Sequence, residues 1–458
     1  AGSGKTSVLT KRIEFLIKYK GVDPKKILAI TFTRKARQEM DTRLKCMGIS
    51  TNVETFNSFS EKILRKYASL IYNRDIKVIN YGNKIMSLMA ALNNQGLTID
   101  DAINKYFTPN QKRNKTPEQL SRLFMNDCFF ILEYFKSKNL DLYDFSIDSD
   151  PEHAATAKMM HKLSLYLKKY MEVSGLRDFT DQIIDTIKFF KENKDFIPEY
   201  DYILIDEYQD VNAMQIELLD LINSKNIFAV GDPRQSIFGW RGSSINYILN
   251  FQKKYPESIV ITLTKNYRSN NHVVDFMNKS IKNMGLPDIK HNFFGEKQIF
   301  LENLSTELAE FEYIINRILW SNVGREEIFV LSRTNRQLMD LSKIMKQKGI
   351  PHIIKTDEFN GSANASVGQV TLATIHSIKG LEAKTVFVMG CNEQNFPCKA
   401  SDHPVIEIIK VEDYDKEEEE RRLFYVAISR AKQTLYLTYT GKNPTYFINK
   451  EMLDMLDT

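Results

Sequence analysis

The chain has 458 residues, of which 43% are hydrophobic and 26% charged, and its formal net charge is +5. This composition is typical of a soluble globular protein with more than one domain, and the basic excess favours an acidic partner such as nucleic acid without requiring one. The four cysteines form no CxxC pair and match no histidine spacing, so neither a disulfide framework nor a zinc site is expected. No apolar run is long enough to cross a membrane and no signal-like segment opens the chain, so neither export nor membrane anchoring is expected.

The chain opens with AGSGKT, the end of the pattern G-x-x-x-x-G-K-[ST], and a helical pattern follows over residues 7–20. In such a loop the backbone N–H groups of Gly2, Ser3 and Gly4 point at phosphate oxygens beside a helix N-terminus. Lys5 supplies a positive charge to the terminal phosphates, and the Thr6 hydroxyl can hold Mg²⁺. The first glycine of the pattern would precede residue 1, so the chain is expected to begin inside its own phosphate loop. Standing alone, GSGKT could also be a glycine-rich turn.

Short apolar runs then alternate with amphipathic helical patterns, which is typical of parallel sheets flanked by helices. A first series of predicted strands covers residues 27–32, 202–205, 227–230 and 259–263, and a second covers 328–331, 370–373, 386–389 and 434–438. Between about Tyr67 and Gly175 long helical patterns replace this rhythm, and we interpret them as a helical insertion in the first α/β domain. Residues 359–369 (FNGSANASVGQ) are predicted to be a loop between two strands.

The run YILIDEYQD places two adjacent carboxylates, Asp206 and Glu207, at the end of an apolar strand. Asp206 is suited to bind Mg²⁺, directly or through water, and Glu207 to orient or deprotonate an attacking water. Adjacent carboxylates at a strand tip repel each other, so a purely structural use is costly. A solvated acidic turn is the alternative interpretation, which the upstream GKT disfavours.

The segment GWRG sets Trp240 beside Arg241 between two glycines, in surroundings too polar for an ordinary core strand. An exposed aromatic ring next to a guanidinium suits stacking on an unpaired base with a phosphate contact. A buried tryptophan that anchors the loop is the competing interpretation.

Taken together, AGSGKT, ITFTRKARQEM, VETFNSFS, DEYQD, AVGDPRQSIFGWRG, TLTKNYRS, TIHSIKGLEAKTVFV and EEEERRLFYVAISRAKQTL occur in this order. They resemble the ordered motifs of superfamily-one DNA helicases of the UvrD, Rep and PcrA type, over residues 1 to about 440. The resemblance implies an α/β fold with two RecA-like P-loop domains. The domain boundaries that we predict are 1–66 and 178–264 for the first RecA-like domain, 67–177 for its helical insertion and 265–458 for the second RecA-like domain.

The same resemblance implies a catalytic site shared between the two domains. Gln235 would sense the γ-phosphate, and Arg268 and Arg430 would neutralise charge on the transferred phosphoryl group. Tyr267 would stack on adenine and Glu382 would approach the ribose. The alternatives are a turn for Gln235, a core aromatic for Tyr267 and, for Arg430, one position on a surface salt-bridge face that begins at EEEERR.

The resemblance also implies a groove for single-stranded DNA. Besides Trp240 and Arg241, its lining would comprise Phe32, Arg34, Thr55, Asn57, Phe238, Arg333, Asn335 and His376. Stacking on base faces carries little sequence preference and does not read the 2′-hydroxyl, so RNA is not excluded.

The sequence departs from the family pattern in several places. Ser7 follows GKT where an arginine that sandwiches adenine is usual, and Arg12 is the candidate substitute. Asn57 stands where many relatives have histidine, and Ala383 where an aromatic residue is usual. Residues 355–369 also replace a sizeable helical insertion, which commonly touches duplex DNA, and the chain ends soon after the last motif. We therefore expect a compact motor that needs a protein partner to open duplexes.

The function expected from the sequence is that of an ATP-dependent DNA helicase or translocase that moves 3′-to-5′, with ATP and Mg²⁺. Its expected partners are single-stranded DNA and junctions of single strand and duplex, with no membrane partner. We expect a monomer in the cytoplasm, associated with the nucleoid, or in the host cytoplasm if the source is viral. Two alternatives stay open: a nucleotide-switched nucleic-acid clamp, and the motor part of a recombination helicase–nuclease.

Overall fold

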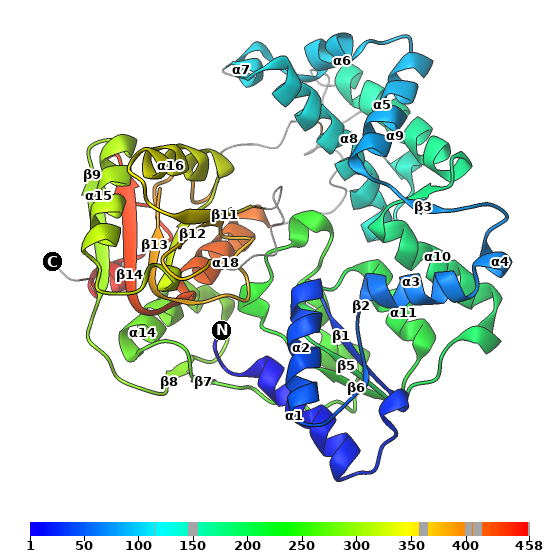
Figure 1. Cartoon of the computed structure of the whole chain (residues 1–458), viewed down its shortest axis with the longest axis horizontal. Coiled ribbons are helices and arrows are strands. Elements are labelled where there is room, and N and C mark those ends of the chain that lie inside the picture. Colours follow the sequence, from blue (N-terminus) through cyan, green and yellow to red (C-terminus); the bar gives the residue numbers. More distant parts are fainter. Residues whose placement is uncertain (114, 145–153, 357–364, 399–404, 406–414, 457–458) are drawn as a thin grey trace.

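Two parallel β-sheets and a separate group of helices organise the chain (Figure 1). The computed structural model describes every residue except 114, 145–153, 357–364, 399–404, 406–414 and 457–458. The α/β class with parallel sheets, predicted from the alternating pattern, is confirmed. Among the described residues, no helix combines the length and the apolar character that crossing a membrane requires.

The first sheet holds four parallel strands, and helices cover both of its faces. Their order is β2 (Asn52–Thr55), β1 (Ile27–Thr31), β5 (Tyr202–Ile205) and β6 (Asn226–Ala229). Ile27 and Ala29 pack with α1 (Lys5–Lys18) and α2 (Arg34–Cys46). Leu28 and Ile30 pack on the other face with α3 (Phe56–Lys66), α10 (Phe179–Glu192) and α11 (Ala213–Ile222). Burial on both faces is why β1 is apolar at every position before its final threonine.

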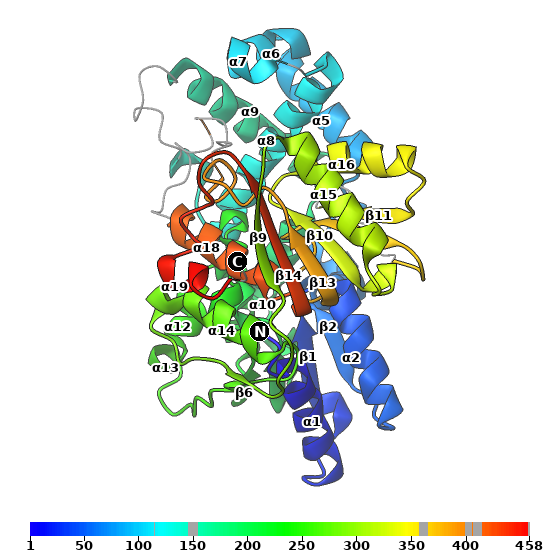
Figure 2. The same ribbon diagram turned by 90° about the vertical axis from the view of Figure 1, so that its left-hand side faces the viewer.

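The second sheet holds six parallel strands and is built in the same way (Figure 2). Their order is β11 (His352–Lys355), β12 (Val370–Thr374), β10 (Ile328–Ser332), β13 (Ala383–Val388), β14 (Ala431–Thr440) and β9 (Ile299–Leu304). Phe329 and Leu331 pack with α14 (Asn271–Ser280) and α18 (Lys416–Ile428). Ile328 and Val330 pack with α15 (Glu307–Trp320) and α16 (Asn335–Gln347) on the opposite face.

The helical part has a core of its own. The helical part comprises α5 (Tyr81–Asn94), α6 (Ile99–Tyr106), α7 (Pro109–Lys112), α8 (Pro117–Lys138) and α9 (Ala154–Val173), and its core is formed mainly by α5, α6, α8 and α9. The sequence sets both ends of α8: Thr116 and Gln119 form a capping box, Pro117 stands in the first turn, and Asn139 adopts a left-handed C-cap. The short α4 (Ala68–Ile71), β3 (Lys77–Val78) and β4 (Leu176–Arg177) lie where this part joins the first α/β part (Figure 1).

The strand predicted at residues 259–263 is wrong, whereas the other predicted strands are confirmed with ends shifted by a few residues. Ile259 and Ile261 are 87% and 78% exposed. This run and Ala229 of β6 line the same cavity of about 360 Å³, so the run makes no ladder with the edge of the sheet. Apolar character alone does not make a strand, because the backbone must also pair with a neighbouring strand, and here a cavity lies beside the edge strand β6. The loop predicted at 359–369 lies in part outside the described residues.

One buried ion pair fixes the helical part to the first α/β part, and it yields a test of the fold. The Lys136 ammonium near the end of α8 lies 2.8 Å from Asp178 and 2.6 Å from Asp181, at the start of α10. Replacement Lys136→Met leaves two largely buried carboxylates without their cation. We expect it to lower the free energy of unfolding, measured by urea titration, by about 3 kcal/mol. Lys162→Met, at an exposed position of α9, is the control, and equal small losses in the two variants would contradict the assignment.

Candidate nucleotide and nucleic-acid site

The phosphate-loop residues form a tight turn at the start of α1. Gly2 and Gly4 have φ values of +68° and +76°, a region that glycine enters without strain, and Gly4 is the N-cap of the helix. A Cβ on Gly2 would stand 2.7 Å from the Arg268 Cβ, so the loop lies directly against the chain that leads into the second sheet. The Tyr267 N–H donates to the Gly2 carbonyl at 2.8 Å, which fixes that contact.

Asp206 and Glu207 follow β5 as predicted, and the fold gives them different environments. The Thr6 hydroxyl donates to an Asp206 carboxylate oxygen at 3.1 Å. Burial raises the pKa of Asp206 to about 6, and the neighbouring Glu207 adds to the rise. For Glu207, burial favours the protonated form, but Lys379 and Lys5 outweigh it and hold its pKa below the ordinary value. Glu207 also has a φ of +50°, an unusual backbone conformation for a residue other than glycine.

A hydroxyl and a carboxylate so close together suit a hard divalent cation such as Mg²⁺, because both offer oxygen ligands. Among the described residues no cluster of three or more His, Cys, Asp or Glu side chains could hold a metal by itself. This agrees with the way Mg²⁺ binds in phosphate sites, through one or two side chains together with substrate phosphates and water. Thr6 and Asp206 therefore fit the predicted metal position.

Gln235 and Arg430 come from different sheets and meet in the interior. The Gln235 amide donates to Asp232 at 2.7 Å, and an Arg430 N–H donates to the Gln235 amide oxygen at 3.2 Å. Arg430 is 0% exposed and also donates to the carbonyls of Val426 and Leu381. Burial lowers the pKa of Arg430 to about 9, and the nearby Arg268 contributes. The surface salt-bridge face considered as an alternative for Arg430 is therefore wrong.

Arg268 contacts Glu382, the residue that directly precedes β13. The Arg268 guanidinium donates to the Glu382 carboxylate at 2.5 Å and to the Ser429 carbonyl at 3.0 Å. Tyr267 is 58% exposed, so it is not the core aromatic considered as its alternative. An exposed ring beside the phosphate loop is free to stack on a planar ligand.

Lys379 is a site residue that the sequence pattern did not single out. Its ammonium donates to the Gln235 carbonyl at 2.7 Å, forms an ion pair with Asp210 and lies 4.0 Å from Glu207. It also lies over the Phe238 ring, 5.1 Å from the centroid. Its position within TIHSIKGLEAKTVFV was the one indication of a role, and the spacing of residues 207 and 379 in the sequence does not predict that they are close.

Two arginines lie near the start of α1, where Ser7 follows the phosphate loop. The Arg12 guanidinium lies over the rings of Phe15 and Phe228, at 5.6 and 5.9 Å from their centroids. Arg43 of α2 donates to the Ser7 hydroxyl at 3.4 Å. Arg12 therefore stays the predicted substitute, and Arg43 is a second arginine next to Ser7.

Trp240 is half-buried within a cluster of rings from three parts of the chain. Its ring stacks on Phe130 of α8 at 6.5 Å and meets His376 edge-on at 5.9 Å. The Arg241 guanidinium lies 4.4 Å from its centroid, and Phe238 lies 6.1 Å from His376. The indole N–H has no hydrogen-bond partner among the described residues. The ring is thus neither freely exposed nor a full core residue, and Phe130 is a neighbour that the sequence did not indicate.

The other predicted groove residues differ in whether their side chains already form hydrogen bonds or ion pairs. Arg34 is exposed at the start of α2, and the Asn335 amide oxygen is buried without a partner among the described residues. The remaining three polar residues are engaged: Arg333 pairs with Glu420, Thr55 caps α3, and Asn57 donates to the Phe179 carbonyl. Phe32 packs edge-on against Phe56 at 5.9 Å.

The contact between the Trp240 loop and α8 can be tested by filling it. Gly242 has a φ of +89°, and a Cβ there would overlap the Ser137 hydroxyl oxygen of α8. In a Trp320→Phe background, which leaves Trp240 as the one tryptophan, we expect Gly242→Ala to separate the Trp240 and Phe130 rings and shift the fluorescence to the red. Gly349→Ala has a similar φ of +65° but open space around its Cβ, so it should leave the emission unchanged. Unchanged emission in both variants would contradict the contact.

Comparison with known proteins gives a consistent result. The UvrD/REP helicase N-terminal domain matches residues 1–256, and the UvrD-like helicase C-terminal domain matches residues 261–361 and 354–442. The chain is 34% identical to the ATP-dependent DNA helicase PcrA of Staphylococcus aureus, over 77% of this chain and 47% of that protein. It is 29% identical to a probable DNA helicase II homolog of Mycoplasma capricolum (77% and 48% covered) and to a probable DNA helicase of Mycoplasma pneumoniae (95% and 79%).

The chain spans about half the length of the Staphylococcus aureus and Mycoplasma capricolum relatives and about four-fifths of the Mycoplasma pneumoniae relative. The N-terminal family match alone covers more than half of the chain, and it contains the phosphate loop, DEYQD and GWRG. The chain belongs to the UvrD/Rep/PcrA-type family of superfamily-one helicases.

Proposed function

We propose that the chain is an ATP-dependent DNA helicase or translocase that couples ATP hydrolysis to movement along single-stranded DNA. The observation that carries this proposal is the pairing of groups from the two sheets around the phosphate loop. Arg430 and Lys379, from the second, reach Gln235 and Asp210, from the first. A nucleotide bound at the loop would therefore be enclosed by both α/β parts. Hydrolysis and release would loosen this closure, which is how such motors convert chemistry into a step.

In the proposed reaction Lys5 and the N–H groups of Gly2, Ser3 and Gly4 hold the phosphates, and Thr6 and Asp206 would hold Mg²⁺, which would neutralise charge on the phosphate oxygens. Glu207, whose pKa stays low, accepts the proton of the attacking water. Arg268, Arg430 and Gln235 stabilise charge on the phosphoryl group. Because Arg268 and Glu382 contact each other in this structure, a nucleotide has to draw Arg268 toward the phosphates as the ribose approaches Glu382.

For the nucleic-acid track we propose the ring cluster at Trp240 with Arg241, Phe238 and His376, extended by Arg34, Phe32, Thr55, Asn57, Arg333 and Asn335. Burial lowers the pKa of His376 well below its ordinary value, and nearby cations contribute, so it acts as a neutral stacking ring. We further propose that the chain moves 3′-to-5′, prefers strand–duplex junctions, is a monomer and uses a partner that assists duplex opening. We also propose domain boundaries at 66/67, 177/178 and 264/265 and a location at the nucleoid.

The base assigned to Glu207 gives the first test of the proposal. Glu207→Gln keeps the shape of the side chain but removes the proton acceptor. We expect ATP hydrolysis stimulated by single-stranded DNA to fall by about 10²-fold or more, the usual contribution of a positioned base. The control is Glu199→Gln, whose side chain is 87% exposed, and it should retain full activity. If E207Q hydrolyses ATP as well as the control, the motor assignment is wrong and the nucleotide-switched clamp is favoured.

The stacking platform is tested by binding alone. Trp240→Ala removes the ring that we place against a base. We expect the free energy of binding to a labelled single strand, measured by fluorescence anisotropy, to become less favourable by about 1–3 kcal/mol. Trp320→Ala on α15, where the ring is 77% exposed, is the matched control. Equal affinities of the two variants would remove Trp240 from the track.

A further inference from the structure

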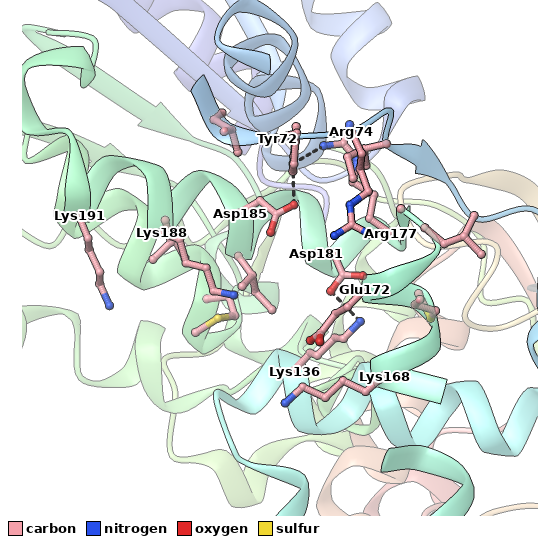
Figure 3. A pocket seen from close by; sticks show the side chains of 18 of the residues that line it. Tyr72, Arg74, Lys136, Lys168, Glu172, Arg177, Asp181, Asp185, Lys188 and Lys191 are labelled. Carbon is pink, nitrogen blue, oxygen red and sulfur yellow. Dashed lines mark hydrogen bonds and ion pairs between the residues drawn. The ribbon is translucent and has the colours of Figure 1, made fainter. Parts of the chain in front are cut away.

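A second cavity lies away from the phosphate loop, between the helical part and the first α/β part. It has a volume of about 690 Å³, which is within the range of small-molecule sites, roughly 300–1,000 Å³. The ends of α8 and α9 form one wall, and α10 and α11 form the other (Figure 3). None of the residues that line it belongs to the proposed nucleotide site or to the ring cluster at Trp240.

The cavity combines apolar walls with an excess of positive charge. Six basic and four acidic side chains line it among the described residues. The apolar lining comprises nine side chains from several elements: Leu70, Ile71, Ile76, Leu140, Met171, Leu176, Ile184, Ile187 and Met214. Such a lining suits a ligand with a carbon body and more than one negative group, because the apolar wall covers the body while cations meet the charges.

Most of the charged groups in the lining already have partners. Lys136 pairs with Asp178 and Asp181, and Lys191 lies 2.5 Å from Glu217. The second carboxylate that α10 contributes, Asp185, accepts the Tyr72 hydroxyl at 2.6 Å. These pairs hold the two walls together and do not by themselves offer a ligand site.

Three positive groups retain unused donors. Lys168 of α9 and Lys188 of α10 form no ion pair within the described part of the chain, and their side chains reach into the space between the two helices (Figure 3). Arg177 is 7% exposed; its guanidinium pairs with Glu61 and donates to the Tyr72 hydroxyl at 2.9 Å, and its Nε has no hydrogen-bond partner among the described residues. A buried donor without an acceptor costs stability, and an anion in the cavity would supply the acceptor.

We propose that this cavity binds a small organic anion that carries two or more phosphate or carboxylate groups. Lys168, Lys188 and Arg177 meet the negative groups from both walls, and the apolar lining covers the rest of the ligand. A ligand that bridges α9 and α10 strengthens the docking of the helical part on the first α/β part. Since α8 of the helical part contacts Trp240 and Gly242, docking also sets the position of the nucleic-acid platform, a consequence that rests on the proposed function.

Isothermal titration calorimetry tests the binding. The protein carries Lys5→Ala, which weakens phosphate binding at the other site, and the probes are inorganic triphosphate, citrate and ADP. Binding of triphosphate alone identifies a polyphosphate ligand, citrate alone a polycarboxylate, and ADP with the highest affinity a nucleotide. No binding of any probe at millimolar concentration overturns the proposal. Because hydrolysis is not measured, a failure here is distinguishable from a failure of the motor assignment.

Variants locate the bound anion. In the Lys5→Ala background we expect Lys168→Gln with Lys188→Gln to weaken binding at least tenfold. Lys162→Gln with Lys169→Gln removes the same charge from exposed positions of α9 outside the cavity and should leave the affinity unchanged. Glu172→Gln removes a lining carboxylate beside Lys168 and should tighten binding several-fold. Equal affinities in the two lysine pairs overturn the proposal. So does a loss of single-stranded DNA binding without any change in anion binding, which assigns these lysines to the DNA backbone.

Discussion

The structure depends on a charge that is buried between two sheets. Arg430 has no access to water, and its hydrogen bonds run to Val426 of the preceding helix α18, to Leu381 and to Gln235 of the first α/β part. A buried guanidinium is costly unless its donors are met, so the two parts are held where these acceptors lie. A γ-phosphate is a stronger acceptor for the same group than a neutral amide oxygen. In the proposed function, a nucleotide would replace this internal hydrogen bond with a stronger one.

Lys379 extends this coupling from the phosphate loop to the ring cluster. It contacts Asp210 and the Gln235 carbonyl on one side and lies over Phe238 on the other. Phe238 and Trp240 follow Gln235 within five residues, and His376 precedes Lys379 by three. Gln235, which we propose for catalysis, thus stands on the same short segment as Phe238 and Trp240, and Lys379, which contacts the Gln235 carbonyl, stands on the same short segment as His376. In the proposed function, a base that moves these rings would also move the groups around Glu207, and this is the physical route that we propose for stimulation of hydrolysis by nucleic acid.

Much of this arrangement could be predicted from the sequence, because its strands are buried on both faces and read as continuous apolar runs. Residues 27–31 and 202–205 are two such runs. The sequence also paired the motifs GKT and DE, and in the structure the Thr6 and Asp206 side chains of these motifs are in contact. The failures share a cause. The run 259–263 has the composition of a strand but pairs with no strand, although it lines a cavity together with the edge strand β6. Phe130 and Lys379 reach their partners across more than a hundred residues. Such contacts depend on the packing of whole domains, which local pattern does not contain.

The packing of α8 explains why the environment of the GWRG segment differs from the one expected from the sequence. GWRG suggested an open loop, but the fold presses it against α8, where Gly242 leaves no room for a side chain beside Ser137. The helical part therefore supports the platform from behind, and the ion pairs of Lys136 hold it there. The position of an insertion that carries no catalytic group thereby bears on the track itself.

The most direct test of the motor assignment is the rate of ATP hydrolysis by the protein in the absence of nucleic acid and in the presence of single-stranded DNA, single-stranded RNA or blunt duplex. The coupling through Lys379 and the ring cluster predicts strong stimulation by single-stranded DNA and little by blunt duplex. Equal stimulation by single-stranded RNA would leave the motor intact and change its track. Negligible hydrolysis under every condition, with binding of single-stranded DNA preserved, would contradict the motor and identify the chain as a clamp.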